Sequence, residues 1–190
     1  MKIFIQIASY RDPQLVLTIK DCIEKAKHPN NLIFSIARQF NNDDKFDDLS
    51  EFNNDKRFKI INIPYTESKG VCWARNLTQQ QYNGEEYTLQ IDSHMRFELN
   101  WDETLINMIK QLQDKGHKKP LLTGYVSSFD PENDPQGRVL DPWRMVFDRF
   151  TPEGCVFFLP EIIPNWKDLT EPIPARFYSA HFCFTLGDFS

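Results

Sequence analysis

The chain has 190 residues, of which 41% are hydrophobic, and these values suit one globular domain with a packed core. Its 22 Lys and Arg against 27 Asp and Glu produce a formal net charge of −5, without the basic excess of proteins that bind phosphate backbones. Nucleic acid is therefore not an expected partner, and no apolar run approaches the roughly 18 residues that predict a membrane span.

The first part of the chain alternates apolar runs with amphipathic segments. Four runs rich in β-branched and aromatic residues predict strands: residues 3–8, 32–37, 58–63 and 87–91. Three segments with apolar residues at helical spacing predict helices: residues 13–27, 70–82 and 101–115. This alternation predicts an α/β fold, with a mainly parallel, Rossmann-like central sheet flanked by helices.

Capping patterns mark two of the helix starts. Asp12 followed by Pro13 predicts an N-cap with proline in the first helical position. Asn100 with Glu103 three residues later predicts a capping box, and Gly116 is expected to end that helix. The segment 41–55 is rich in Asn and Asp, and we interpret it as a solvated connection rather than a calcium site.

After Pro120 the pattern changes to short apolar runs joined by segments rich in proline and aromatic residues. Strands are expected over residues 121–126, 155–159 and 177–186. No composition typical of a flexible linker separates this part from the first, so we expect one domain. His181, in the last apolar run, is interpreted as a histidine of the core rather than a metal ligand.

Polar residues follow three of the expected strands. Ligands of open α/β sheets gather at the carboxyl ends of the strands, so these residues are candidates for binding. They are Ser9, Tyr10 and Arg11 after the first strand, Gln39 after the second, and Asp92, Ser93 and His94 after the fourth. Neither a GxGxxG nor a Walker A motif is present, which argues against a dinucleotide enzyme and a P-loop NTPase.

Asp92 and His94 flank Ser93, and both side chains can face one cation. Two protein ligands leave coordination positions for water and for a diphosphate, as is usual for magnesium and manganese beside nucleotides. An imidazole ligand favours manganese over magnesium. In the alternative interpretation, Asp92 caps the following loop and His94 is an ordinary polar surface residue.

Three motifs occur in order along residues 3–102: IASYRDP, then GVCWARN, then EEYTLQIDSHMRF followed by WD. Together they resemble the GT-A glycosyltransferases, and more narrowly the cytoplasmic N-acetylglucosaminyltransferases that modify hydroxyproline and their bacterial relatives. The resemblance implies a GT-A fold and metal-dependent transfer of a sugar, N-acetylglucosamine in the first place, from a UDP-sugar. The acceptor would be a hydroxyl of a protein, a glycan or a small alcohol, and the anomeric configuration would be retained.

The resemblance also implies roles for individual residues. Ser9, Tyr10 and Arg11 would line the base and ribose pocket, to which we add Gln39 from its position after a strand. The expected catalytic residues are Asp92, near the ribose and the metal, His94, a metal ligand, and Arg75, on the diphosphate or a pocket carboxylate. A divalent ion and an arginine in these places stabilise the charge that grows on the departing diphosphate.

The same resemblance divides the expected domain into a nucleotide-sugar-binding half, residues 1–116, and the start of an acceptor-side half, residues 117–190. The carboxylate-bearing segment expected in the second half is not found, so we expect either part of a longer enzyme or a module that binds nucleotide-sugar or carbohydrate without turnover. A third hypothesis is a hydrolase with Asp92 and Asp102 as paired carboxylates. Four widely spaced cysteines without a CxxC motif fit a reducing, cytoplasmic location.

Overall fold

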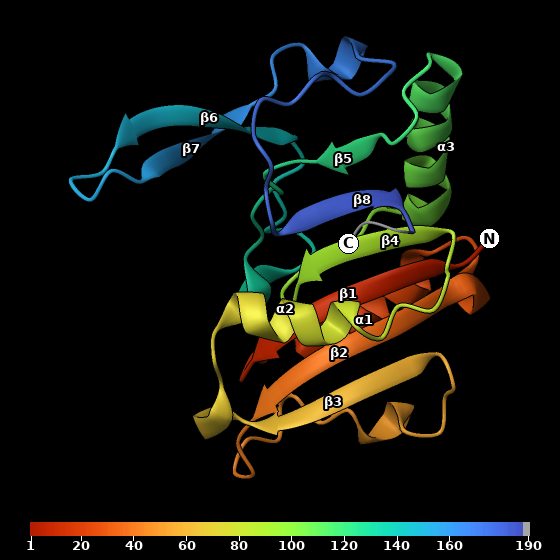
Figure 1. Ribbon diagram of the computed structural model, residues 1–190, viewed down its shortest axis with the longest axis vertical. Coiled ribbons are helices and arrows are strands. Elements are labelled where there is room, and N and C mark those ends of the chain that lie inside the picture. Colours follow the sequence, from red (N-terminus) through yellow and green to blue (C-terminus); the bar gives the residue numbers. More distant parts are fainter. Residues whose placement is uncertain (188–190) are drawn as a thin grey trace. The chain divides into compact units, whose positions relative to one another are not determined.

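A six-stranded sheet with the order β3-β2-β1-β4-β8-β5 and a separate pair, β6-β7, make up the strands of the computed structural model, which describes residues 1–187 (Figure 1). The strands are β1 Ile3–Tyr10, β2 Leu32–Phe40, β3 Phe58–Pro64, β4 Tyr87–Asp92, β5 Leu121–Thr123, β6 Trp143–Phe150, β7 Val156–Ile162 and β8 Phe182–Leu186. The α-helices are α1 Leu15–Lys25, α2 Val71–Gln79 and α3 Trp101–Asp114. The expected α/β fold, a central sheet flanked by helices, is confirmed.

The chain divides into two compact units. Among the described residues, one comprises Met1–Leu121 and residues 184–187, and the other comprises Leu122–Cys183. The functional halves expected on either side of residue 116 stay a prediction. Within residues 1–187, no helix has the length and apolar character needed to cross a membrane.

Parallel pairing brings the ends of three strands together in the first unit. β1 pairs in parallel with β2 on one side and with β4 on the other, and β2 pairs in parallel with β3. Tyr10 lies opposite Gln39, and Ala8 lies opposite Asp92. The strands run further than predicted, so Ser9, Tyr10, Gln39 and Asp92 lie in their last residues, at one edge of the sheet.

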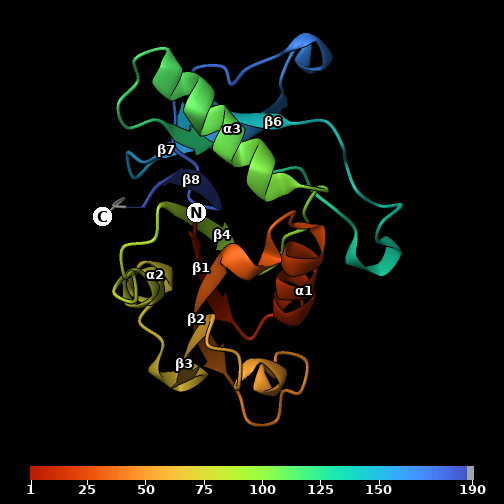
Figure 2. The same cartoon turned by 90° about the vertical axis from the view of Figure 1, so that its right-hand side faces the viewer.

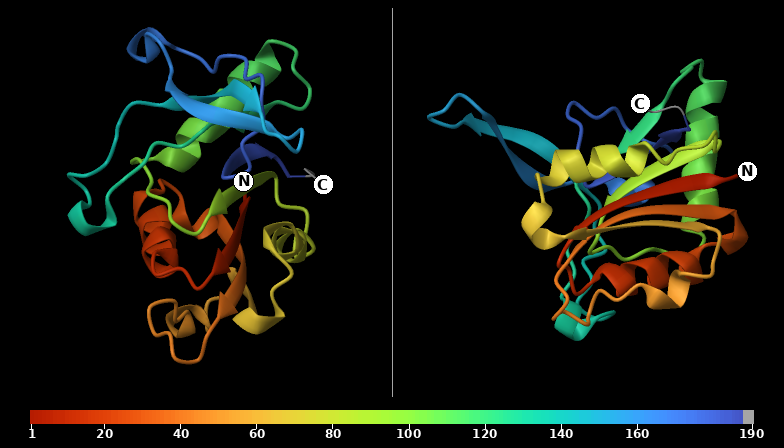
Figure 3. Two further views of the ribbon diagram at one scale, coloured as in Figure 1. Left: turned by 90° about the vertical axis from the view of Figure 1, so that its left-hand side faces the viewer. Right: turned by 60° about the horizontal axis from the view of Figure 1, so that its bottom comes forward.

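Helices α1 and α2 lie on opposite faces of strands β1 to β4 (Figures 2 and 3). This is why β1 is a continuous apolar run: Phe4, Ile5 and Ile7 are fully buried. On one face, Ala74 of α2 packs in a cluster with Ala37 of β2. The buried residues of α1 are Leu15, Thr18, Ile19 and Cys22.

Two of the predicted helix starts need correction. Helix α1 begins at Leu15, two residues later than expected, because the Asp12 carboxylate accepts the N–H of Gln14 and forms a turn before the helix. Asn100 precedes α3 in a left-handed conformation, with φ of 61°, and its side chain makes no capping hydrogen bond, so the expected capping box is wrong. Gly116, with φ of +94°, follows the end of α3 as predicted.

The segment 41–55 is less solvated than its composition predicts. Asp47 is fully buried, and Leu49 and Phe52 are 2% and 9% exposed. The Phe52 ring stacks on Phe58 of β3 at a centroid distance of 4.5 Å, which covers part of the sheet. The expectation of a solvated connection is therefore wrong at Asp47, and the apolar Leu49 and Phe52 of the same segment are buried.

The strands of the second unit differ from the predicted ones. Strand β6, Trp143–Phe150, was not expected, and it forms an antiparallel pair with β7 that has an irregularity between Phe147 and Arg149. Its apolar run, residues 145–147, is only three residues long and lies between charged residues, and Phe150 is 65% exposed. The last strand, β8, begins at Phe182 rather than at residue 177.

Candidate functional site

Gln39 connects the ends of two neighbouring strands. Its Nε2 donates to the carbonyl oxygen of Ser9 at 3.0 Å, and its Oε1 accepts from Ser68 Oγ at 2.5 Å. Ser9 is fully buried, and its Oγ has no hydrogen-bond partner within residues 1–187. The structure thus brings Ser9 and Gln39 together, with the amide of Gln39 occupied by protein groups on both sides.

Tyr10 and Arg11 meet two residues that the sequence did not single out. The Tyr10 ring, whose residue is 54% exposed, lies edge-on to the ring of Tyr65 at 6.4 Å between centroids. Arg11 lies over the same Tyr65 ring at 4.9 Å and places Nε 2.6 Å from Asp44 Oδ2. The hydrogen bond from Arg11 lowers the pKa of Asp44. Asp44 belongs to the polar segment 41–55, and no local pattern linked it to the end of β1.

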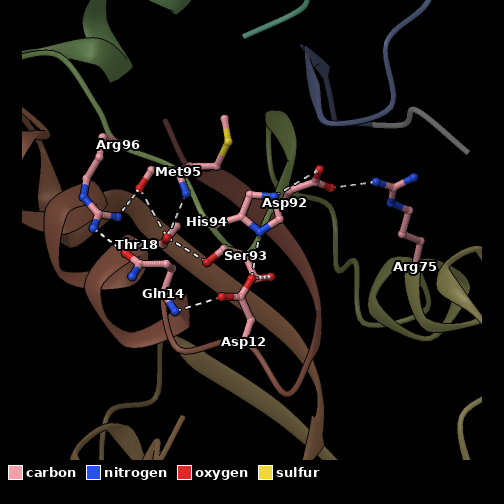
Figure 4. Close-up of polar contacts among 9 residues, drawn as sticks. All are labelled: Asp12, Gln14, Thr18, Arg75, Asp92, Ser93, His94, Met95 and Arg96. Atoms are coloured by element: carbon pink, nitrogen blue, oxygen red, sulfur yellow. Dashed lines mark hydrogen bonds and ion pairs between the residues drawn. The ribbon is translucent and has the colours of Figure 1, made fainter. Parts of the chain in front are cut away.

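Arg75 and Asp92 form an ion pair across the edge of the sheet. Arg75 of α2 places Nη2 2.8 Å from Asp92 Oδ1 at the end of β4 (Figure 4). The two side chains are 17% and 29% exposed, so the pair is partly shielded from solvent. Arg75 Nε is buried and has no partner in the described part of the chain. Arg75 thus reaches a carboxylate, one of its two expected targets.

His94 lies between two carboxylates (Figure 4). Its Nδ1 is 2.7 Å from Asp12 Oδ2, and its Nε2 is 4.0 Å from Asp92 Oδ2. The hydrogen bond to Asp12 raises the pKa of His94, against an opposing effect of burial. For Asp12, burial acts to raise the pKa, but hydrogen bonds from His94, Ser93 and the Gln14 backbone outweigh it and lower the pKa. Sequence reasoning treated Asp12 as a helix cap and missed this contact.

The segment that carries His94 is attached to α1 over several residues. Thr18 Oγ1 donates to the carbonyl oxygen of Ser93 at 2.8 Å and accepts the N–H of Met95 at 2.9 Å. The N–H of Phe97 donates to Asp21 Oδ2 at 2.6 Å. Backbone groups on both sides of His94 are therefore held by one rigid helix.

Asp102 lies in a different place from Asp92. Its carboxylate is buried and accepts the backbone N–H groups of Lys27 and His28 at 2.7 and 2.9 Å. These two residues precede β2, so Asp102 belongs to the amino end of the parallel strands, whereas Asp92 ends β4. The hypothesis of a hydrolase with Asp92 and Asp102 as paired carboxylates is therefore wrong. His181, in the second unit, has its ring edge-on to Tyr125 at 4.7 Å.

Comparison with known families identifies the chain. The family model described as Glycosyltransferase (GlcNAc) matches residues 2–55 and 43–190, which together span nearly the whole sequence. The chain belongs to this glycosyltransferase family. A comparison with curated proteins found no significant match.

Solved structures support the fold of this glycosyltransferase family member. S. aureus TarS 1-349 in complex with UDP-GlcNAc has a TM-score of 0.54 and 16% sequence identity, over 72% of this chain and 37% of that chain. The complex of S. aureus TarS 1-349 with UDP has a TM-score of 0.53 and 15% sequence identity, over 72% of this chain and 38% of that chain. The chain thus matches less than two fifths of the length of these TarS chains, and the likeness shows the GT-A type of fold.

Two atoms of the cluster around Asp92 have the chemistry of metal ligands. Asp92 Oδ2 and His94 Nε2 lie 4.0 Å apart at the end of β4. Within residues 1–187, no three His, Cys, Asp or Glu residues gather in a way that could hold a metal. A carboxylate and an imidazole are ligand types that divalent ions accept, and an ion held by these two alone would take its other ligands from a diphosphate and water.

Proposed function

We propose that this chain carries the donor site of a metal-dependent glycosyltransferase that moves N-acetylglucosamine from UDP-N-acetylglucosamine to a hydroxyl acceptor, with retention of configuration. The supporting observation is the arrangement at the end of β4, where Arg75 and His94 approach the two oxygens of the Asp92 carboxylate. Family membership and the fold shared with the UDP-GlcNAc complex of TarS favour the same donor.

Ser9, Tyr10 and Arg11 are the residues proposed to bind the base and ribose. Tyr10 offers an exposed aromatic ring, and its neighbour Tyr65 holds Arg11 by a cation–π contact. Gln39 contributes to this site through the backbone, because its Nε2 donates a hydrogen bond to the carbonyl oxygen of Ser9 and holds it in place. Aromatic rings and hydrogen-bonding groups at the end of a strand are well suited to a planar base and a ribose.

Asp92 and His94 would hold the divalent ion, manganese more readily than magnesium because one ligand is an imidazole. Such an ion, when bound, stabilises negative charge on the diphosphate. Arg75 keeps the Asp92 carboxylate oriented through its contact with Oδ1, which leaves Oδ2 on the side of His94. We further propose that the acceptor is a hydroxyl of a protein or glycan and that the enzyme is located in the cytoplasm.

Calorimetric titration with UDP tests the donor site. We expect binding in the presence of Mn²⁺, weaker binding with Mg²⁺, and a loss of at least tenfold in affinity with EDTA or in the variants His94→Ala and Asp92→Asn. His28→Ala is the matched control, because His28 lies near the amino ends of the strands and contacts Asp102 through its backbone only. The absence of UDP binding under all conditions, or equal binding in every variant, would refute the proposal.

Release of UDP from UDP-N-acetylglucosamine tests turnover. Because water serves as a poor acceptor, we expect slow, Mn²⁺-dependent release that disappears in Asp92→Asn. Binding of the donor without release, in the presence of peptide, glycan and small-alcohol acceptors, would instead support the second candidate, a module that binds nucleotide-sugar without turnover.

A further inference from the structure

The Asp12 carboxylate accepts from or contacts three protein groups. Its Oδ1 accepts the N–H of Gln14 at 2.8 Å, and its Oδ2 accepts from Ser93 Oγ at 2.6 Å and contacts His94 Nδ1 at 2.7 Å. The side chain is 14% exposed. Asp12 is therefore placed to orient other groups rather than to bind a ligand itself.

The contact with Asp12 determines which imidazole nitrogen carries the proton. An ionised carboxylate only accepts hydrogen bonds, so Nδ1 of His94 must be the donor. In the neutral ring the proton then resides on Nδ1, and Nε2 keeps its lone pair. This is the nitrogen that faces Asp92 Oδ2 (Figure 4).

The backbone around His94 is held independently of any ligand. Thr18 is fully buried, and its hydroxyl bonds the carbonyl oxygen of Ser93 and the N–H of Met95. Since these groups lie immediately before and after His94, the backbone at His94 has little freedom to move. Asp12 therefore acts on a ring whose backbone is already in place.

We propose that Asp12 is a positioning residue that holds His94 in the Nδ1–H tautomer, with Nε2 directed toward Asp92 and ready to bind the divalent cation. A histidine that binds a metal through one nitrogen commonly donates its other N–H to a carboxylate, which fixes the ring and raises its basicity. The proposal rests on the proposed function for the identity of the ligand. Its geometric part concerns the metal-free protein alone.

Nitrogen-15 NMR of the imidazole in metal-free protein is the first test. In the wild type we expect neutral His94 to carry its proton on Nδ1, and in Asp12→Ala we expect a mixture of tautomers. The matched control is Asp21→Ala, which removes the carboxylate that holds Phe97 on the same segment but leaves Asp12 in place. A wild-type proton on Nε2, or the same change in both variants, would overturn the proposal.

Affinity for Mn²⁺ is the second test, measured by electron paramagnetic resonance with and without UDP. We expect Asp12→Ala to bind Mn²⁺ about 10- to 100-fold more weakly, the usual effect of removing an outer carboxylate, and Asp21→Ala to bind it like the wild type. Asp12→Leu, which is similar in size but offers no acceptor to His94 Nδ1, replaces Asp12→Ala if that variant does not fold. Wild-type Mn²⁺ affinity in a folded Asp12 variant would overturn the proposal.

The two tests separate this proposal from the donor site. If the wild type shows the Nδ1–H tautomer and binds neither Mn²⁺ nor UDP, the proposed function fails while the orientation of His94 by Asp12 stands. If the wild type binds Mn²⁺ and UDP with the proton on Nε2, the function stands and the role of Asp12 fails.

Discussion

Arg38 and Asp47 form an ion pair that is almost completely removed from solvent. Arg38 Nη2 lies 2.7 Å from Asp47 Oδ1, and the side chains are 13% and 0% exposed. The pair ties the segment 41–55 to β2, so a residue in the middle of a polar run becomes part of the core. A buried pair costs much desolvation, and removing one partner leaves the other charge uncompensated.

We therefore expect Asp47→Ala to lower the free energy of unfolding by about 3–5 kcal/mol, measured by urea denaturation. Asp43→Ala is the control: Asp43 is exposed in the same segment, and its loss should change stability by less than about 0.5 kcal/mol. Equal effects of the two substitutions would contradict the structural role of the buried pair.

Replacement of Arg75 by lysine tests its contact with Asp92. Lysine keeps the positive charge but lacks the planar group with several donors, so Arg75→Lys is not conservative at this position. We expect UDP affinity in the presence of Mn²⁺ to fall about tenfold or more, which is about 1.4 kcal/mol, with the melting temperature near that of the wild type. Asn76→Ala, an exposed neighbour on α2, should bind UDP like the wild type. Unchanged affinity in Arg75→Lys would remove Arg75 from the donor site.

The pH dependence of His94 follows from its contact with Asp12. Its pKa in the metal-free folded protein is raised above 6.5, so the protonated form is favoured by folding. The stabilisation of the folded state by the contact of His94 with Asp12 is complete below the ordinary pKa of histidine. It is lost as the pH rises through the raised pKa of His94. It is small, because the side chain is 58% exposed and screened by water.

An NMR titration of the His94 ring protons checks this expectation. In the wild type the midpoint should lie above 6.5, and in Asp12→Ala it should move down toward that value. A midpoint at or below 6.5 in the wild type would mean that the hydrogen bond to Asp12 does not outweigh burial in solution.

Asp102 is expected to matter for stability and not for ligand binding. Asp102→Asn leaves one acceptor oxygen for the two N–H groups of Lys27 and His28. A hydrogen bond to a charged group contributes about 1.5–3 kcal/mol, so we expect a loss of that order in the free energy of unfolding. UDP affinity should be unchanged in the folded protein. A specific loss of UDP release at wild-type stability would show that Asp102 takes part in the reaction.

Local patterns predicted the strands of the first unit well and the helix ends less well. Strands β1 and β4 are buried on both faces, so their apolar runs are visible without knowledge of their neighbours. The start of α3 depends on a contact with another element, because the N–H of Asn100 donates to the carbonyl oxygen of Lys25 at the end of α1. Strand β6 was missed because its continuous apolar run, residues 145–147, is only three residues long and is bounded by charged residues.

The amino-acid sequence by itself determined the α/β pattern and the polar residues that follow its strands, among them Tyr10, Gln39 and Asp92. The apolar runs that form buried strands, and the polar residues that end these runs, are visible within short segments of the sequence. Only the tertiary structure decided which of these residues meet. Asp12 contacts His94 and Arg11 contacts Asp44 across 82 and 33 residues of chain. Such contacts depend on the order of the strands and the packing of α1, which no local pattern contains.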